Sequence, residues 1–334
     1  MDMDVTGDPP VTVQSPTSLH DKDGRFFRYP LPQLLCYYLR PEVALLMADA
    51  RALVGRPIAR ALNDTTLERC ERLMKRRGRP PRLSVLSSDD PSAQSYLKSI
   101  RSAALKLATD LLEFPVKEGA TTQSVIEEIT KLNQNEDVDG ILVQSPMPEG
   151  VDLRAISRAI DPRKDIDGIS PTQAGLLFQG IPKALVPSTA RACIEMLDYY
   201  KYSLQGVEVV VIGRSLVVGR PVAMLALSRN ATVTWCHTKT LSMSNVCKRG
   251  EILITAAGKP RLITAHYVRA GATVIDVGIN VDENGKLTGD VDEASISNIA
   301  AAYTPVPGGV GPVTVACLFA NLLDAAGPKS RRAV

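Results

Sequence analysis

A glycine-rich turn between a strand pattern and a helical pattern is the segment whose residue types most clearly suggest chemistry. The strand VEVVVI runs into Gly213-Arg214-Ser215, and Gly219 opens the helix GRPVAMLA. Such a unit directs the N–H groups of a helix N-terminus at a pyrophosphate. The spacing departs from GxGxxG, because Ser215 takes the middle position and the last glycine comes one residue late. A tight turn that binds no ligand is therefore the alternative interpretation.

The end of the next strand pattern favours NADP over NAD. In NAD-binding folds an acidic residue about 20 residues beyond the turn holds the ribose hydroxyls. Here the strand ATVTWC ends in His237-Thr238-Lys239, with no acid. Together with Arg214 in the turn before it, these side chains suit a 2′-phosphate. The alternative for His237 and Lys239 is a solvated loop.

Three further segments combine proline or glycine with polar side chains where a strand or helix ends. ILVQSPMP carries Gln144, KDIDGISP carries Asp165 and Asp167, and TPVPGGVGPVTVA enters the last helix. Rigid loops of this kind let a backbone approach a ligand closely, and ligands bind at the carboxyl ends of strands in open parallel sheets. The alternatives are a tight connection without a ligand and, for Asp165, a turn residue.

The composition excludes several classes of partner and site. Lys and Arg number 39 and Asp and Glu 36 among 334 residues, which leaves a net charge of +3, and only 4% of residues are aromatic. We therefore expect no nucleic-acid partner. No apolar run reaches about 18 residues, so no membrane partner is expected. The six cysteines form no CxxC pair and the three histidines form no HExxH motif, so no metal site is expected.

The cysteines and the first residues predict a cytoplasmic protein. Scattered cysteines in a chain of this length are typical of reduced thiols inside a cell. The start of the chain lacks the basic region of a secretory signal. It carries acidic residues, which mitochondrial presequences avoid, at Asp2, Asp4, Asp8, Asp21 and Asp23.

Helical and strand patterns alternate along the chain, which predicts βαβ units and a parallel α/β sheet. The first set consists of helical patterns over 43–78, 94–111 and 121–138 and strands over 81–88 and 140–146. The second set has helices over 188–202, 219–230 and 312–327, and strands over 207–215, 231–237, 251–258 and 272–280. Residues 1–40, which begin with a polar stretch over 1–24, are predicted to form a mobile N-terminal extension.

The ordered motifs resemble one family. They are DDPSAQSYLKS, DGILVQSPMP, DPRKDIDGISP, VVIGRSLVVGRP, CHTKT, AAGKP, VIDVGIN, GDVD and TPVPGGVGPVTVA, between about residue 85 and residue 316. In this order they resemble the bifunctional methylenetetrahydrofolate dehydrogenase/methenyltetrahydrofolate cyclohydrolase family. The resemblance implies two α/β domains with folate between them. Residues 41–187 plus 312–334 would form the N-terminal αβ folate-binding catalytic domain, onto which the C-terminal helix packs back, and 188–311 a Rossmann-like parallel-sheet NADP-binding domain.

The resemblance also implies an activity and its partners. The family transfers hydride from methylenetetrahydrofolate to NADP⁺ and then adds water to the methenyl product, giving 10-formyltetrahydrofolate. Tetrahydrofolate derivatives are therefore the expected partners, NADP is the expected cofactor, and no metal takes part. A homodimer is implied by the family alone.

Residue roles carry over by position within the matching motifs. Tyr96, Gln144 and Asp167 would be catalytic and would contact the folate. Gly308, Gly309 and Pro312 would shape the floor of the folate pocket. The implied cofactor-binding residues are Gly213, Arg214, Ser215, Gly219, Thr238 and Ile279.

One departure from the family pattern concerns the chemistry directly. The family has a catalytic lysine four residues after the tyrosine, and this chain has Ile100 there. Lys98 lies about 200° round the helix from Tyr96, and Arg101 lies about 100° from the needed position. Isoleucine cannot titrate, so we predict that cyclohydrolase activity is lost or severely weakened while hydride transfer survives.

Smaller departures and two alternative functions complete the prediction. Val186-Pro187-Ser188-Thr189 stands where the family commonly has Pro-Cys-Thr-Pro. The first alternative is a divergent folate- and NADP-binding pseudoenzyme that acts as an interaction partner. The second, an unrelated NADP dehydrogenase, would explain the glycine turn but not TPVPGGVGPVTVA.

Overall fold

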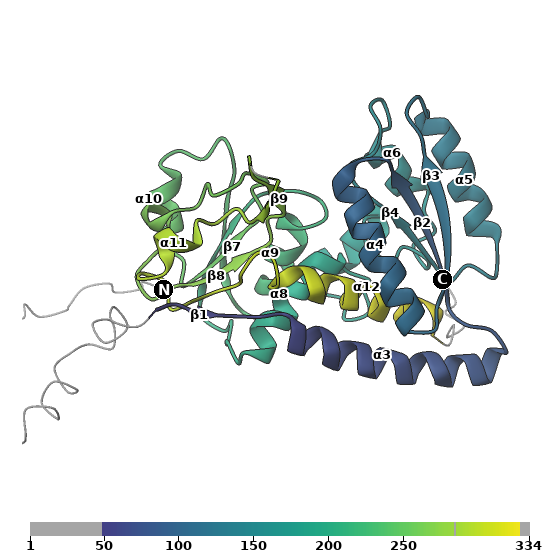
Figure 1. Ribbon diagram of the computed structural model, residues 1–334, viewed down its shortest axis with the longest axis horizontal. Coiled ribbons are helices and arrows are strands. Elements are labelled where there is room, and N and C mark those ends of the chain that lie inside the picture. The colour runs from purple at the N-terminus through teal and green to yellow at the C-terminus, as the bar shows by residue number, and fades with distance from the viewer. Residues whose placement is uncertain (1–48, 284, 328–334) are drawn as a thin grey trace, which may run out of the picture. The chain divides into compact units, whose positions relative to one another are not determined.

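The computed structural model describes residues 49–283 and 285–327 (Figure 1). The predicted N-terminal extension over 1–40 lies outside the described residues. None of the helices within the described ranges is long and apolar enough to cross a membrane.

Most helices begin at the residues that helix-capping rules favour. Asp90 accepts hydrogen bonds from the N–H groups of Ser92 and Ala93, and Thr121 forms a capping box with Ser124. The helices are α3 (Arg56–Arg77), α4 (Pro91–Lys106), α5 (Thr122–Gln134), α6 (Leu153–Ala159), α7 (Pro171–Phe178), α8 (Ser188–Tyr199), α9 (Gly219–Leu227), α10 (Met243–Cys247), the 3₁₀ helix η1 (Ala265–Tyr267), α11 (Glu293–Ile296) and α12 (Val310–Ala326).

The N-terminal half contains a parallel three-stranded sheet. Its order is β3 (Asp110–Val116), β2 (Arg82–Ser88) and β4 (Gly140–Val143). Apolar side chains cover both faces: α4 and α12 pack on one, and α5 and α6 pack on the other. Strands buried on both sides explain the continuous apolar run of β4.

The second half contains a parallel six-stranded sheet. Its order is β1 (Arg51–Ala52), β11 (Ala302–Tyr303), β8 (Thr273–Asp276), β7 (Ile252–Thr255), β5 (Glu208–Ile212) and β6 (Thr232–Cys236). A short antiparallel hairpin of β9 (Asn280–Val281) and β10 (Leu287–Thr288) follows β8. Helices α8 and α9 cover one face of the large sheet, and α10, α11 and η1 cover the other. The predicted α/β class with two parallel sheets is confirmed.

Two helical predictions were wrong in part. Residues 51–52 are strand β1, not helix, because the N–H groups of Arg51 and Leu53 donate to carbonyl oxygens of the β11 segment. The helix predicted over 94–111 ends at Lys106, where Ala108 takes a positive φ of 49°, and Asp110–Val116 form β3. The sequence DLLEFPV did not read as a strand, because it carries charged residues and a proline that only an edge position tolerates.

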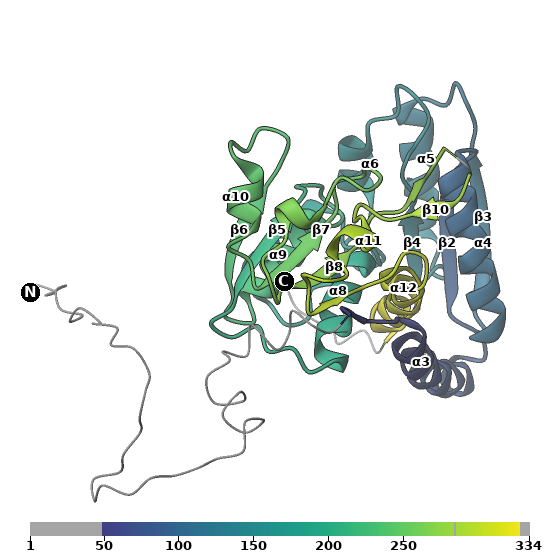
Figure 2. The ribbon, with the colours of Figure 1, turned by 60° about the vertical axis from the view of Figure 1, so that its left-hand side comes forward.

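The last helix joins the two halves of the chain. Its Leu318, Phe319 and Leu322 pack in one cluster with Ile100 of α4 and Leu142 of β4, while its first turns pack with α8 and the large sheet. Figures 1 and 2 both show α12 beside α3 and α8. The prediction that the C-terminal helix packs back on the first domain is confirmed.

Candidate active site

Four loops of the large sheet begin at one edge, because the strands before them end in register. Ile212 is paired with Cys236 and with Thr255, and Thr255 is paired with Asp276. The loops 213–219, 237–240, 256–259 and 277–280 therefore start side by side at the carboxyl edge of a parallel sheet. This is where such folds bind dinucleotides.

The turn after β5 requires glycine at two positions. Gly213 has a φ of +117°, and a Cβ there would lie 2.4 Å from the carbonyl oxygen of Ala256. A Cβ on Gly219 would lie 2.2 Å from the carbonyl oxygen of Gly213. The hydroxyl of Ser215 accepts hydrogen bonds from the N–H groups of Val218 and Gly219, at 3.1 and 3.3 Å. These hydrogen bonds hold the turn in a compact shape directly before the N-terminus of α9. A compact turn at a helix N-terminus is suited to binding a pyrophosphate.

The residues predicted to recognise the 2′-phosphate lie at the same edge. Arg214, Thr238 and Lys239 are exposed. Within the turn after β6, the N–H of Lys239 donates to His237 Nδ1 at 3.2 Å, so the imidazole helps to hold the turn. Ile279, in the loop after β8, is 64% exposed and available to contact a ligand.

Two buried carboxylates that sequence reasoning did not single out hold the loops after β7 and β8. Asp290 accepts hydrogen bonds from the N–H groups of residues 257, 258 and 259 and from the side chain of Asn280. Asp276 accepts from the N–H groups of Gly278, Asp290 and Val291. Burial and the neighbouring charge of Asp290 raise the pKa of Asp276 to about 7. The motifs VIDVGIN and GDVD carry both residues and were the available signal.

Three side chains from separate elements lie together: Tyr96 of α4, Asp167 of the loop between α6 and α7, and Ser188 at the start of α8. The Ser188 hydroxyl donates to Asp167 Oδ1 at 2.7 Å, and the Ser188 N–H donates to the same oxygen at 3.0 Å. Burial raises the pKa of Asp167 to about 6, against the lowering effect of both hydrogen bonds. Burial and the Asp167 charge raise the pKa of the Tyr96 phenol, on which Ser188 also acts. Sequence reasoning noted Ser188 only as a departure from the family pattern.

Among the residues that the structure describes, the side-chain amide of Gln144 has no hydrogen-bond partner. It directly follows β4 and is 3% exposed. Its Nε2 and Oε1 are buried and neither makes a hydrogen bond within the described residues. Because a buried polar group without a partner is costly, this amide is poised for a ligand.

Asp165 is a turn residue, which was the alternative to a ligand-binding role. Its carboxylate accepts hydrogen bonds from the N–H groups of Ile169 and Ser170, at 3.1 and 2.7 Å, and it is fully buried. It closes the turn that presents Asp167.

Ile100 lies in the apolar core. Its side chain is fully buried among Leu97, Leu318 and Phe319. Arg101 is turned away, with its Nε and Nη2 2.6 and 2.5 Å from the carboxylate oxygens of Glu113 on β3. Lys98 is exposed. Neither basic neighbour takes the place of a lysine at position 100.

The loop before α12 packs against the start of α3. The N–H of Gly55 donates to the carbonyl of Gly308 at 2.8 Å, and a Cβ on Gly309 would lie 2.7 Å from the carbonyl oxygen of Pro305. Pro312 is exposed in the first turn of α12. Within the described residues, no hydrogen bond or ion pair joins this loop to the side chain of Tyr96, Gln144 or Asp167. The described part of the chain also contains no group of three or more His, Cys, Asp or Glu side chains placed to hold a metal ion.

Comparison with known protein families identifies both halves of the chain. Family models of the tetrahydrofolate dehydrogenase/cyclohydrolase catalytic domain and of its NAD(P)-binding domain match residues 53–167 and 187–330. The chain belongs to the tetrahydrofolate dehydrogenase/cyclohydrolase family. Tyr96, Gln144 and Asp167 fall within the family's catalytic domain, and the four aligned loops fall within its NAD(P)-binding domain. The family predicted from the motifs is confirmed, with NAD(P) as its cofactor class.

Curated relatives match this family over most of the chain. The bifunctional protein FolD of Acetivibrio thermocellus is 41% identical over 278 residues, which cover 83% of this chain and 97% of the relative. FolD 1 of Rubrobacter xylanophilus is 42% identical over 287 residues, 85% of this chain and 100% of the relative.

Solved structures agree with these relatives. FolD, the bifunctional methylenetetrahydrofolate dehydrogenase/cyclohydrolase of Campylobacter jejuni, is 35% identical with a TM-score of 0.79, covering 83% of this chain and 98% of that one. The enzyme of Trypanosoma brucei, solved with NADP and an inhibitor, is 34% identical with a TM-score of 0.80, covering 86% of this chain and 100% of that one. The comparisons support an enzyme of this family and not the pseudoenzyme alternative.

Proposed function

We propose that this protein is an NADP-dependent methylenetetrahydrofolate dehydrogenase whose cyclohydrolase activity is lost or severely weakened. The observation that carries the proposal is the fully buried Ile100, one helical turn after Tyr96. Hydride transfer depends mainly on positioning two bound molecules, which the remaining site residues can provide. The hydrolytic step needs a group that moves a proton, and isoleucine has none.

The folate site would be formed by Tyr96, Gln144 and Asp167. With a pKa of about 6, Asp167 is ionised at neutral pH and can accept hydrogen bonds from the N–H groups of a pterin. The buried amide of Gln144 offers one acceptor and two donors close to the reacting centre. Tyr96 remains a neutral phenol, so its ring can pack against the folate. Loss of hydride leaves a cationic methenyl group, which a nearby carboxylate would stabilise. Gly308, Gly309 and Pro312 are proposed to shape the floor of this pocket.

The cofactor site would be the carboxyl edge of the large sheet. Turn residues 214–217, which lie ahead of the positive end of the α9 dipole, would bind the pyrophosphate. Arg214 and Thr238, with no acid between them at the strand ends, would bind the 2′-phosphate. Ile279 would pack on the nicotinamide side, next to the loop that Asp290 holds. When bound, NADP⁺ supplies the hydride acceptor.

The domain division, assembly and location are also proposals. We propose 41–187 plus 312–334 as the catalytic domain and 188–311 as the NADP-binding domain, with β1 as an element contributed to the large sheet. A homodimer in the cytoplasm is proposed, with no nucleic-acid or membrane partner. Five cysteines that are buried and free among the described residues support a reducing compartment.

Paired assays on the purified protein test the function. With methylenetetrahydrofolate and NADP⁺, we expect methenyl product to form and then decay only at its uncatalysed rate. Absence of methenyl product at high enzyme concentration would reject the dehydrogenase. Decay faster than in the enzyme-free control would reject the loss of cyclohydrolase activity.

A further inference from the structure

We infer that Asn321 of α12, locked in orientation by Arg191 of α8, is a positioning residue that holds Asp167 and Ser188 in place for the folate. The inference rests on the proposed function, because it takes Asp167 as the folate-binding carboxylate. It assigns a role in the reaction to a residue deep in the last helix, a helix whose other residue in the predicted folate pocket is Pro312.

The side chain of Asn321 joins two segments of backbone. Its Nδ2 donates to the carbonyl oxygens of Ile166 and Val186, at 2.8 Å each. These carbonyls lie one residue before Asp167 and two residues before Ser188. Asn321 is 1% exposed, so water does not replace either bond. One amide therefore fixes the spacing between the two chain segments whose side chains form the Asp167–Ser188 pair.

The two segments have little room to adjust. Gly168, the residue after Asp167, has a φ of +60°, and a Cβ there would lie 2.2 Å from the carbonyl oxygen of Leu185. The segments thus approach within backbone contact beside the site. A shift of either segment would change the 2.7 Å bond from Ser188 to Asp167. Moving a site group by about 1 Å can reduce the reaction rate about a hundredfold.

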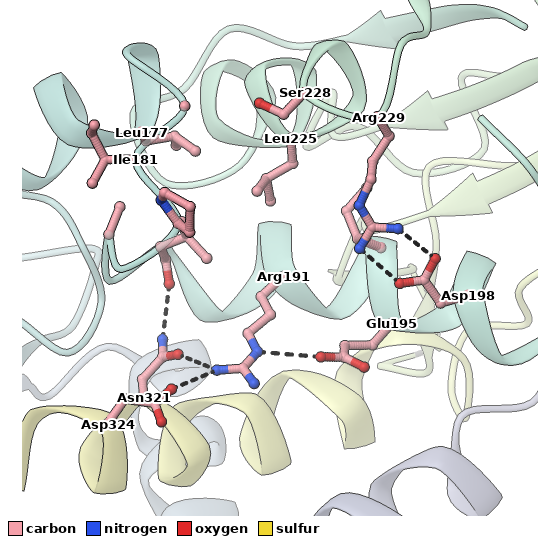
Figure 3. Close-up of a pocket in the computed structure, with 15 residues that line it drawn as sticks. Leu177, Ile181, Arg191, Glu195, Asp198, Leu225, Ser228, Arg229, Asn321 and Asp324 are labelled. Carbon is pink, nitrogen blue, oxygen red and sulfur yellow. Dashed lines mark hydrogen bonds and ion pairs between the residues drawn. The ribbon is translucent and has the colours of Figure 1, made fainter. Parts of the chain in front are cut away.

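Arg191 determines which way the amide of Asn321 points. Its Nη1 donates to Asn321 Oδ1 at 2.7 Å, which leaves Nδ2 facing the two carbonyls. The guanidinium is itself held by Glu195, at 3.3 Å from Nε, and by Asp324, at 3.2 Å from Nη1. Figure 3 shows this chain of contacts along one side of a pocket of about 340 Å³.

The same pocket contains a matched control. Arg229 forms a two-bond ion pair with Asp198, at 2.8 and 2.9 Å, away from Asn321 in Figure 3. This pair bonds to neither the Ile166 nor the Val186 carbonyl. Arg229→Met therefore removes a comparable charge from the pocket without touching the proposed link.

The test compares steady-state kinetics of Asn321→Leu with those of the wild type. Leucine has nearly the same volume but no donor, so the two carbonyls lose their partner. We expect kcat/KM for methylenetetrahydrofolate to fall at least tenfold, while KM for NADP⁺ changes less than twofold. Arg191→Met, which frees the amide to rotate, should give a smaller loss of the same kind, and Arg229→Met should give none.

The outcomes separate the inference from the proposed function. A folded Asn321→Leu with unchanged kcat/KM for methylenetetrahydrofolate, or with a KM for NADP⁺ that rises as much as the KM for the folate, overturns the positioning role. If Asn321→Leu does not fold, Arg191→Met decides: a fall in kcat/KM for methylenetetrahydrofolate with KM for NADP⁺ unchanged supports the role, and an unchanged kcat/KM overturns it. If the wild type itself has no dehydrogenase activity, the proposed function is wrong. Tetrahydrofolate binding, measured by thermal shift, then decides: binding weakened at least tenfold in the variant supports the link, and equal binding overturns it.

Discussion

Ser188 donates two hydrogen bonds to one oxygen of Asp167, from its hydroxyl at 2.7 Å and from its backbone N–H at 3.0 Å. Both bonds favour the ionised carboxylate, whereas burial opposes it, and the balance leaves the pKa of Asp167 at about 6. The same hydroxyl acts on the Tyr96 phenol. Ser188 therefore connects two of the three residues proposed to contact the folate, Asp167 and Tyr96.

Ser188→Ala should move the acid limb of the dehydrogenase pH profile upwards. The variant keeps the backbone bond but loses the hydroxyl that lowers the pKa of Asp167. We expect the acid limb of kcat/KM for methylenetetrahydrofolate to shift by about one pH unit. Ser188→Cys, a weaker donor, should shift it less. The control is Ser170→Ala, since Ser170 acts on Asp165 instead. Identical profiles for Ser188→Ala and wild type would contradict this expectation.

Asp167→Asn should abolish efficient turnover but make the protein more stable at alkaline pH. The folded pKa of about 6 lies above the ordinary value of 3.8. The stabilisation from the protonated carboxyl is therefore complete below about pH 4 and is lost as the pH rises through about 6. Asparagine stays neutral throughout, so the variant should gain about 2 kcal/mol relative to wild type between pH 4.5 and pH 8.

Urea unfolding at the two pH values measures this gain. Glu113→Gln is the control with the opposite sign, because the hydrogen bond from Arg101 lowers the pKa of Glu113. The free energy of unfolding of Glu113→Gln should fall relative to that of the wild type as the pH rises. A gain for Asp167→Asn that is the same at both pH values would show that ionisation is not its cause.

Ile100→Lys should introduce cyclohydrolase activity. The new ammonium group would lie one helical turn from Tyr96, where burial would lower its pKa towards that of a proton shuttle. Hydrolysis of the methenyl product should then exceed the uncatalysed rate, while dehydrogenase kcat changes little. Because Ile100 is fully buried, we expect a loss of about 2–4 kcal/mol in the free energy of unfolding.

Ile100→Met separates titration from packing. It preserves an apolar side chain of similar volume and should leave hydrolysis at the uncatalysed rate. If the folded lysine variant hydrolyses no faster than the methionine variant, the missing activity has a cause other than the side chain at position 100.

Arg214→Ala should weaken NADP⁺ selectively. Removing the exposed guanidinium at the glycine turn takes away a partner of the 2′-phosphate, so KM for NADP⁺ should rise about tenfold or more. KM for NAD⁺, which lacks that phosphate, should stay within twofold. Arg249→Ala is the control, because Arg249 pairs with Glu208 at the opposite edge of the sheet. If KM rises equally for NADP⁺ and for NAD⁺, Arg214 does not bind the 2′-phosphate.

Local patterns were sufficient to predict the class of fold and most of its elements. Apolar runs of the length of β5, β7 and β8 and capped amphipathic helices such as α5 are encoded within a few neighbouring residues. Glycine turns and the family motifs placed the cofactor edge and the three proposed folate contacts. The departure at Ile100 was also visible in the sequence, because helix geometry relates positions four apart.

Only the tertiary structure determined the elements and contacts that depend on distant partners. The strand β1 exists because Arg51 and Ala52 pair with residues some 250 positions later, and β3 is stable as an edge beside β2. Ser188 reached Asp167 through the packing of α8, and Asn321 reached Ile166 and Val186 through the return of α12. A single buried asparagine in an apolar helix does not say which carbonyls it will meet. Such partners are chosen by how the helices and sheets pack, which no local periodicity specifies.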